Sequence, residues 1–395
     1  MRTPVTPFPL SRRLSEVRGS AIRDLLTLTA RADVLSLAGG LPAADQLPRE
    51  RIAEAAARAL TDSASVQYSE TAGVAGLRAV IADHETGRIG RPVAPTDVVV
   101  TSGSQQALDL VARAVLDPGD PVAVEDPVYV GALQVFQASG AQVHALPLDD
   151  DGLRVDVLAE RLAQGFRPRL VHTVASFHNP RGVTMAPGRR RALAELADRY
   201  GFLVVEDDPY GLLAFDGVPP QPIAAHGERI VRLGSASKVI APALRVGWLV
   251  GPPELTAAVE RLKQCTDLCS SSLTQAITAE LLSDTAWFDG HVGGVRAENR
   301  RRAHALTTAV DTRFGDAVVR STPTGGMFVW LEFADGTDTT ALLPKALGQG
   351  VGFVPGSAFE AGDTARTSAA RLCFATYPGD LLEIAVDRLA TAWRA

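Results

Sequence analysis

The segments FLVVEDDPY (202–210) and IVRLGSASK (230–238) each begin with a short apolar run and end in polar residues. The runs Phe202–Val205 and Ile230–Leu233, apolar except for Arg232, are typical of strands that are buried on both faces. Similar runs recur along the chain and alternate with helical patterns. The further expected strands are Val98–Thr101, Pro121–Val124, Leu170–Thr173 and Val246–Val250, and the expected helices are Ser104–Leu116, Tyr129–Ser139 and Arg189–Tyr200. This alternation predicts an α/β fold whose mostly parallel central sheet is covered by helices on both sides.

The pattern changes after residue 254, where long helical stretches are followed by strand-like runs and a last helix. The expected segments are Pro253–Leu282, Val292–Phe314, Gly326–Phe333, Arg371–Ala375 and Gly379–Trp393. The first 50 residues contain an expected helix, Ile22–Thr29, and an extended segment, Val34–Leu37, which should pack against the C-terminal part. We therefore expect a large domain over residues 51–284 and a smaller α+β domain formed by residues 1–50 with residues 285–395.

Polar residues cluster at the expected strand ends, where sheets of this kind bind their ligands. They lie in 101–105 (TSGSQ), 125–129 (EDPVY), 176–180 (SFHNP), 206–210 (EDDPY) and 234–238 (GSASK). The five segments supply a helix N-terminus that suits a phosphate, an aromatic ring, an amide, carboxylates, a phenol and a lysine. Together these are the functional groups that pyridoxal phosphate needs.

Each segment also has an ordinary structural interpretation. The turn before Ser104 is compatible with a simple helix N-cap, and a lone lysine such as Lys238 is usually solvated. The acidic run 206–208 could face solvent, but carboxylates that follow a buried strand need a partner, and a protonated pyridine nitrogen is one. Asn179-Pro180 alone signals only a turn. The order of the motifs along the chain is much more specific than any one of them.

Taken in order, SGSQQ, DPVY, HNPRG, EDDPY and SASK, followed by Arg245, resemble the motifs of class I/II aminotransferases of the fold-type I pyridoxal-phosphate family. The sequence is most similar to the branch of 2-aminoadipate and kynurenine aminotransferases. The likeness runs from SAIRDLL and LSLAGGLPAADQLP through QYSETAGVAGLR to RLCFATYPGD. It implies an enzyme that moves the amino group of an L-amino acid to a 2-oxo acid, with 2-oxoglutarate as the expected acceptor. It also implies a homodimer with shared active sites.

The resemblance implies a role for each matching position. Lys238 would hold the cofactor as a Schiff base and, once freed, act as general base and acid at the substrate Cα. Asp207, three residues before Tyr210, would pair with the pyridinium nitrogen. The family's spacing selects Asp207 from the acidic run 206–208, because periodicity alone does not distinguish its three members. The other implied positions are Tyr129 stacked on the ring, Tyr210 and Asn179 at the ring oxygen, Ser104, Gln105, Ser235, Ser237, Arg245 and the neighbouring subunit's Tyr68 at the phosphate, Arg371 and Gly40 at the substrate α-carboxylate, and Arg23 at a distal carboxylate.

The likeness also bears on two proline peptide bonds and on Arg23. The peptide bonds Asp126-Pro127 and Asn179-Pro180 should both be cis, which is uncommon for X–Pro bonds. Arg23 has an equally good alternative, a solvated arginine on an amphipathic helix.

Bulk properties narrow the class of protein. The formal net charge of −6 argues against a nucleic-acid surface. The first 20 residues lack the apolar core of a signal peptide, and no apolar run reaches the roughly 18 residues of a membrane span. Cys265 and Cys269, expected on one helical face, and Cys373 have no metal-ligand spacing, so we expect no metal and free thiols in a reducing cytoplasm.

Two other classes of function share parts of this pattern. A pyridoxal-phosphate lyase, racemase or decarboxylase on the same scaffold would keep Lys238 and Asp207. A transcriptional regulator with an aminotransferase-like domain would need a winged helix before SAIRDLL, but that motif begins at Ser20, so we expect no such domain.

Overall fold

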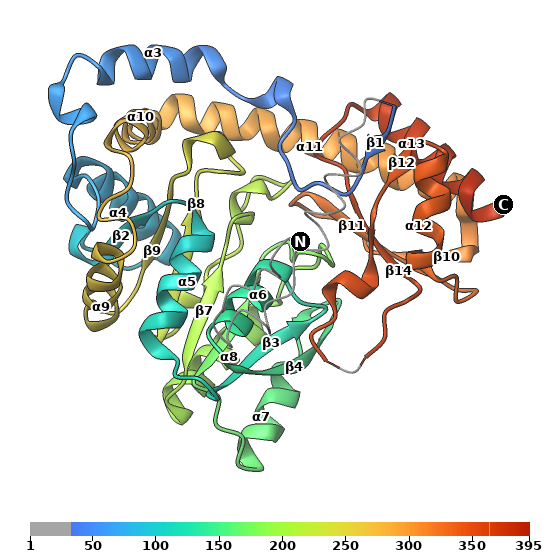
Figure 1. Cartoon of the computed structure of the whole chain (residues 1–395), viewed down its shortest axis with the longest axis horizontal. Coiled ribbons are helices and arrows are strands. Elements are labelled where there is room, and N and C mark those ends of the chain that lie inside the picture. Colours follow the sequence, from blue (N-terminus) through green and yellow to red (C-terminus); the bar gives the residue numbers. More distant parts are fainter. Residues whose placement is uncertain (1–32, 363) are drawn as a thin grey trace, which may run out of the picture.

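The computed structural model describes residues 33–362 and 364–395. An eight-stranded sheet lies at the centre of the larger part of the molecule (Figure 1). Its strands in spatial order are β2 (Val98–Thr101), β9 (Gly247–Val250), β8 (Ile230–Ser235), β7 (Leu203–Asp207), β6 (Leu170–Thr173), β3 (Pro121–Asp126), β4 (Gln142–Asp149) and β5 (Gly152–Leu153). The strands from β8 to β4 are parallel, whereas β9 is antiparallel to both of its neighbours and β5 is antiparallel to β4. The predicted mostly parallel sheet is confirmed.

The central strands are apolar because both faces of the sheet are covered. Successive residues of a strand point to opposite faces. Val205 of β7 packs with helices α5 (Ser104–Val115), α6 (Val130–Ala138) and α9 (Pro253–Gln264). Its neighbour Val204 packs with α7 (Val155–Ala163) and α8 (Pro187–Tyr200) on the other face.

The stretch 253–282, expected to be one long helical region, is two helices. After α9 ends at Gln264, α10 (Ser272–Ser283) begins behind Ser271, whose hydroxyl oxygen accepts a hydrogen bond from the Thr274 N–H (3.3 Å). Leu268, between them, has a φ of +63°, a conformation that an α-helix cannot contain. The shared helical face predicted for two cysteines is therefore wrong: Cys265 caps the C-terminus of α9, and Cys269 lies in the connection.

The C-terminal part contains a second, antiparallel sheet. Its order is β10 (Val318–Arg320), β11 (Phe328–Phe333), β14 (Ala369–Cys373) and β13 (Val354–Pro355). Strand β1 (Leu35–Ser36) pairs in parallel with β12 (Val351–Gly352), so the N-terminal segment does pack against the C-terminal part as expected. Helices α12 (Thr339–Gly348) and α13 (Gly379–Arg394) complete this part; the predicted helix Ile22–Thr29 lies outside the described residues.

The long helix α11 (Thr285–Phe314) extends from beside α10 toward the C-terminal helices (Figure 1). Helix α13 packs along it, and α3 (Arg49–Ala59) and α4 (Ala75–Ile89) contact α10. The division into domains of residues 51–284 and 1–50 with 285–395 stays a prediction. Within the described part of the chain, no helix combines the length and the apolar character needed to cross a membrane.

Candidate active site

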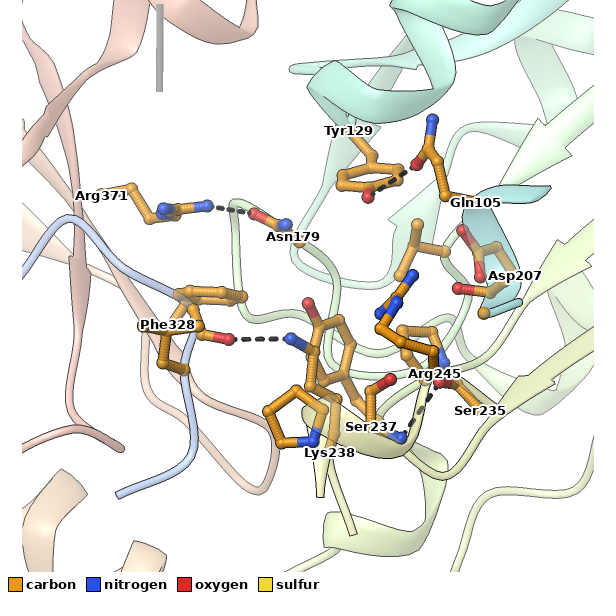
Figure 2. A pocket seen from close by; sticks show the side chains of 18 residues that line it. Gln105, Tyr129, Asn179, Asp207, Ser235, Ser237, Lys238, Arg245, Phe328 and Arg371 are labelled. Atoms are coloured by element: carbon orange, nitrogen blue, oxygen red, sulfur yellow. Dashed lines mark hydrogen bonds between the residues drawn. The ribbon is translucent and has the colours of Figure 1, made fainter. Parts of the chain in front are cut away.

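A cavity of about 400 Å³ lies where the carboxyl ends of β7 and β8 meet the N-terminus of α5. This volume is within the usual range of small-molecule sites, roughly 300–1,000 Å³. Twelve residues predicted from the sequence line it: Gly40, Ser104, Gln105, Tyr129, Asn179, Asp207, Tyr210, Ser235, Ser237, Lys238, Arg245 and Arg371. Figure 2 shows that Arg371 approaches from the C-terminal sheet, opposite Asp207 and Arg245.

The cavity lining lacks one predicted residue, and another predicted residue cannot be placed. Tyr68 does not line it and is 77% exposed, in the segment before α4. Arg23 lies outside the described residues.

Lys238 follows β8 in a tight turn, and its side chain enters the cavity. Its Nζ donates a hydrogen bond to the Gly40 carbonyl oxygen (2.8 Å). Burial lowers the pKa of this amine, and the cations Arg371 and Arg245 lower it further, against an opposing effect of Cys373. A larger fraction of Lys238 is therefore neutral, and so nucleophilic, than for an exposed lysine.

Asp207 ends β7 with a carboxylate that is only partly satisfied. Within residues 33–362 and 364–395, its Oδ1 is buried and has no hydrogen-bond partner. Its Oδ2 lies 3.7 Å from Nε2 of His172 on the neighbouring strand β6. A buried carboxylate oxygen without a partner is costly. Asp207 is therefore suited to a cationic N–H group that a ligand brings.

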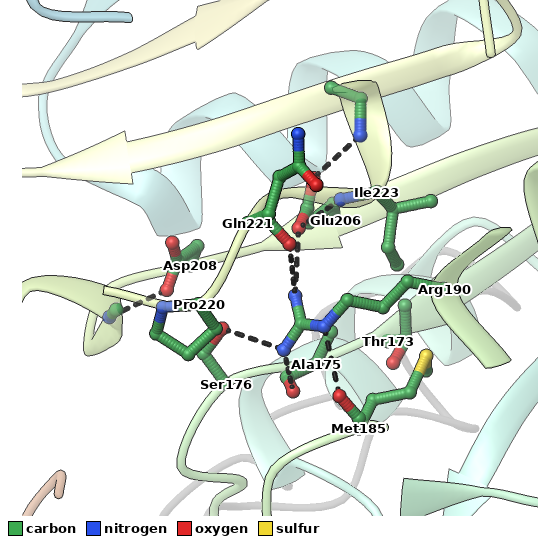
Figure 3. Close-up of polar contacts among 12 residues, drawn as sticks. Thr173, Ala175, Ser176, Met185, Arg190, Glu206, Asp208, Pro220, Gln221 and Ile223 are labelled. Carbon is green, nitrogen blue, oxygen red and sulfur yellow. Dashed lines mark hydrogen bonds and ion pairs between the residues drawn. The ribbon is translucent and has the colours of Figure 1, made fainter. Parts of the chain in front are cut away.

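The acidic neighbours of Asp207 already have partners. Glu206 accepts hydrogen bonds from the backbone of Ile223 (2.9 Å) and Ala224 (3.2 Å) and lies 3.5 Å from Arg190 (Figure 3). Asp208 pairs with Arg232 (2.8 Å) and accepts the Gly211 N–H (2.7 Å).

Charge pairing also keeps Asp208 ionised. Burial alone would raise its pKa, but Arg232 and Arg88 outweigh that effect and lower the pKa to about 2. These contacts select Asp207 as the member of the acidic run that faces the cavity, which the sequence pattern could not do.

The other end of the cavity suits an anion. Helix α5 begins at Ser104, and free backbone N–H groups at a helix N-terminus bind phosphates. Gly103, directly before it, has a φ of +98°, and a Cβ there would lie 2.7 Å from Nη2 of Arg245. Arg245 donates from Nη2 to the Ser102 carbonyl (2.8 Å), and the Ser235 hydroxyl accepts the Ser237 N–H (3.1 Å).

Two phenols line the space between these ends. Burial raises the pKa of Tyr129 and of Tyr210 above the ordinary value of about 10, so both stay protonated and can donate hydrogen bonds. Tyr129 donates its hydroxyl to Oε1 of Gln105 (3.1 Å). The adjoining peptide bonds Asp126-Pro127 and Asn179-Pro180 are both cis, as predicted.

Arg371 is buried in the middle of β14. It donates from Nη1 to Oδ1 of Asn179 (2.8 Å) and from Nη2 to the Ala38 carbonyl. Its guanidinium carbon lies 4.3 Å from the ring centre of Phe328 and 5.1 Å from that of Phe359. Burial lowers its pKa to about 10, so it remains a cation at neutral pH. Its Nε is buried without a partner among the described residues.

Besides the twelve predicted residues, the cavity is lined by Leu41, Gly103, Val174, Pro209, Pro242 and Phe328, and His172 lies next to Asp207. Nothing in the local patterns marks Phe328 and Leu41. His172 could have been found, because its register with Val205 places it on the same face of the sheet as Asp207, two residues further on.

The donor set fits pyridoxal phosphate. Arg245 and the α5 N-terminus suit its phosphate, the unpartnered oxygen of Asp207 suits its ring N–H, and Lys238 suits its aldehyde. The fold and the site together define a fold-type I pyridoxal-phosphate enzyme.

Comparisons with known proteins agree. The model of aminotransferase class I and II matches residues 32–389. The chain is 39% identical over 388 residues to the aromatic-amino-acid aminotransferase 1 of Thermococcus litoralis, covering 96% of this chain and 93% of that one. The kynurenine aminotransferase structure of Pyrococcus horikoshii is 38% identical, with a TM-score of 0.92 and coverage of 98% and 96%.

A second solved structure resembles it as well. It is the alpha-aminoadipate aminotransferase LysN of Thermus thermophilus, complexed with N-(5'-phosphopyridoxyl)-L-leucine, at 36% identity, a TM-score of 0.89 and coverage of 98% and 97%. The chain belongs to the aminotransferase class I and II family. It is a transaminase that depends on pyridoxal phosphate, and the predicted likeness to the aminoadipate and kynurenine enzymes is confirmed.

Proposed function

We propose that this transaminase moves the amino group of an L-amino acid to 2-oxoglutarate, with Lys238, Asp207 and Arg371 as its central residues. One observation carries the proposal. A single cavity brings together an amine with a lowered pKa, a buried carboxylate oxygen without a partner and a buried guanidinium.

Lys238 moves the proton in this scheme. Bound pyridoxal phosphate supplies an aldehyde that takes up amino groups and a ring that withdraws electrons from the substrate Cα. Nζ of Lys238 removes the proton from the substrate Cα in one half-reaction and delivers a proton to Cα in the reverse one. Because its lowered pKa leaves more of the amine neutral, it can act as a base near neutral pH.

Asp207 and Asn179 orient the ring. Asp207 keeps the ring nitrogen protonated by accepting its N–H, while His172 lies behind the other carboxylate oxygen. Asn179 accepts from Arg371 through Oδ1, which leaves its amide N–H groups to donate to the ring oxygen. One side chain thus connects the cofactor end of the site with the substrate end.

Arg371 binds the substrate α-carboxylate, with the Gly40 backbone beside it. A guanidinium held between aromatic rings presents a planar fork that matches a carboxylate. For the distal carboxylate of 2-oxoglutarate we propose Arg23, on the strength of the resemblance of SAIRDLL alone.

A half-reaction screen tests the proposed substrates. Single amino acids are added to the enzyme while the absorbance of its cofactor is followed. L-glutamate and apolar L-amino acids should convert the cofactor to its amine form, since Phe328 and Leu41 give the cavity apolar walls. Each donor should yield its 2-oxo acid. Release of CO₂, loss of the side-chain substituent or racemised amino acid as the main product would favour the alternative enzyme classes.

We also propose a homodimer in which Tyr68 reaches the phosphate of the partner's cofactor. A large aromatic side chain that is 77% exposed, near Val66 at 66%, is typical of a surface that another chain covers. Mixing Tyr68→Phe with Lys238→Ala chains should form hybrids in which one site has both wild-type residues. Activity above the sum of the two parent enzymes is the expected result. A mixture that is merely additive, or a monomeric active enzyme, would contradict shared sites.

Two smaller proposals complete the description. The unpaired state of Cys265, Cys269 and Cys373 is consistent with a reducing cytoplasm. The large domain of residues 51–284 would carry the cofactor, and residues 1–50 with 285–395 would carry Arg23 and Arg371.

A further inference from the structure

Lys263, near the end of α9, is completely buried. Complete burial is unusual for a lysine, which normally lies at the protein surface. The chain has only three lysines, Lys238, Lys263 and Lys345. Nζ of Lys263 lies 2.7 Å from Oδ1 of Asp267, four residues later. Since a buried ammonium group is costly unless a partner holds it, Asp267 is needed to keep Lys263 in place.

The connection between α9 and α10 folds back to make this pair. The backbone N–H groups of Asp267 and Leu268 both donate to the Lys263 carbonyl (3.1 and 3.2 Å). The chain then turns at Leu268 with a φ of +63°, which is strained for a residue other than glycine. The Leu268 side chain is half exposed, so its own packing does not account for the turn.

The second oxygen of Asp267 reaches helix α5. Oδ2 accepts a hydrogen bond from Nε2 of Gln106 (2.9 Å), and Oε1 of Gln106 accepts the Ser102 N–H (2.7 Å). The Ser102 hydroxyl lies 3.5 Å from the same Oδ2. Because a carboxylate can only accept and an N–H can only donate, Asp267 fixes which way the Gln106 amide points.

Ser102 in turn contacts the anion-binding end of the cavity. Its carbonyl accepts from Nη2 of Arg245 (2.8 Å), directly before Gly103 and the start of α5. A continuous series of hydrogen bonds therefore joins Lys263 and Asp267 to Arg245 through Gln106 and Ser102.

We propose that Asp267, anchored by Lys263, is a positioning residue for phosphate binding: it holds the turn at Ser102 and, through it, Arg245. This inference rests on the proposed role of Arg245 and the α5 N-terminus at the cofactor phosphate. Asp267 does not line the cavity, so it acts through its neighbours.

The test compares two ligands that differ only in the phosphate. The full-length chain, stripped of cofactor, is titrated with pyridoxal phosphate and with pyridoxal. Asp267→Asn replaces one acceptor oxygen by an NH₂ group, so the side chain can no longer accept from both Lys263 and Gln106. This variant should raise Kd for pyridoxal phosphate about tenfold. Kd for pyridoxal should stay within about twofold, because the ring-binding residues are untouched. Asp109→Asn is the matched control, since Asp109 forms an i,i+4 pair with Arg113 on the same helix α5, and it should change neither Kd.

A second variant guards against misfolding and tests the route. Gln106→Met keeps the pair of Lys263 and Asp267 but removes the link to Ser102. It should produce a similar selective loss, and the double variant should be no worse than the stronger single one, because both act on one path.

Three results would overturn the inference. Equal weakening of both ligands would mean that Asp267 only supports the fold. If Asp267→Asn binds pyridoxal phosphate as the wild type does while Arg245→Gln binds it much more weakly, the phosphate site is as proposed but Asp267 does not act on it. If Arg245→Gln itself binds both ligands normally, the proposed phosphate site is wrong and this inference fails with it.

Discussion

Replacing Lys238 by alanine is expected to lower kcat by about 10⁴-fold, since the proton transfer at the substrate Cα loses its base and acid. Among the described residues that line the cavity, Lys238 alone carries an amine that could perform this step. The other two lysines are Lys263, which is buried against Asp267, and Lys345, in the last turn of α12. Lys238→Arg should be as inactive as Lys238→Ala, because a guanidinium stays protonated and is a poor nucleophile.

Covalent labelling separates this role from a general loss of structure. Borohydride reduction of the holoenzyme, followed by peptide mapping, should place the pyridoxyl group on Lys238. With only three lysines in the chain, the other two serve as internal controls. Lys345→Arg should keep wild-type activity and the same labelled peptide. A pyridoxyl group on Lys263 or Lys345 would refute the assignment.

The pH dependence should follow from the environment of Lys238. Burial and the nearby arginines lower its folded-state pKa below that of the unfolded chain, so the unfolded state binds more protons between the two values. In the cofactor-free protein, this amine therefore makes the stability rise with pH through that window. Thermal unfolding of the cofactor-free protein against pH, compared with Lys238→Met, should show this rise in the wild type only.

The sequence predicts the sheet well because its central strands are buried on both faces. Leu203–Val205 is apolar throughout and Ile230–Leu233 is apolar except for the paired Arg232, and the polar residues that follow must lie at one edge of a parallel sheet. This is why the sequence alone places the residues at the ends of β7 and β8 in one site. The same logic could have included His172, which interrupts an apolar strand on the face of Asp207.

What the sequence does not contain is the set of partners contributed from distant segments. The choice of Asp207 over Glu206 and Asp208 depends on Arg88, Arg190 and Arg232, which neutralise the two neighbours from three other elements. The break at Leu268 is equally hidden, because it depends on the contacts of Asp267 with α5 rather than on a local glycine or proline. Arg371 was found through the resemblance to a family, since an arginine in an apolar strand has no pattern of its own.

Arg371→Ala should depress kcat/KM about a hundredfold for every amino acid and 2-oxo acid, because all of them carry an α-carboxylate. The buried guanidinium is held at Asn179, at Ala38 and between the rings of Phe328 and Phe359, so its fork is in place before substrate arrives. Arg371→Lys should not restore activity, because an ammonium group cannot donate in a plane to the substrate and to Asn179 together.

Two control variants show whether this loss reflects recognition of the α-carboxylate. Arg320→Ala removes a partly buried arginine of the same sheet that pairs with Asp311 away from the cavity, and it should leave kcat/KM unchanged. Arg23→Ala should weaken glutamate and 2-oxoglutarate while leaving neutral amino acids nearly unaffected, since only the acidic substrates have a distal carboxylate. Steady-state kinetics with paired acidic and neutral donors, together with a melting curve for each variant, measures both effects. If Arg371→Ala spares any substrate, or Arg23→Ala weakens acidic and neutral donors equally, the assignment of the two carboxylates to these two arginines is wrong.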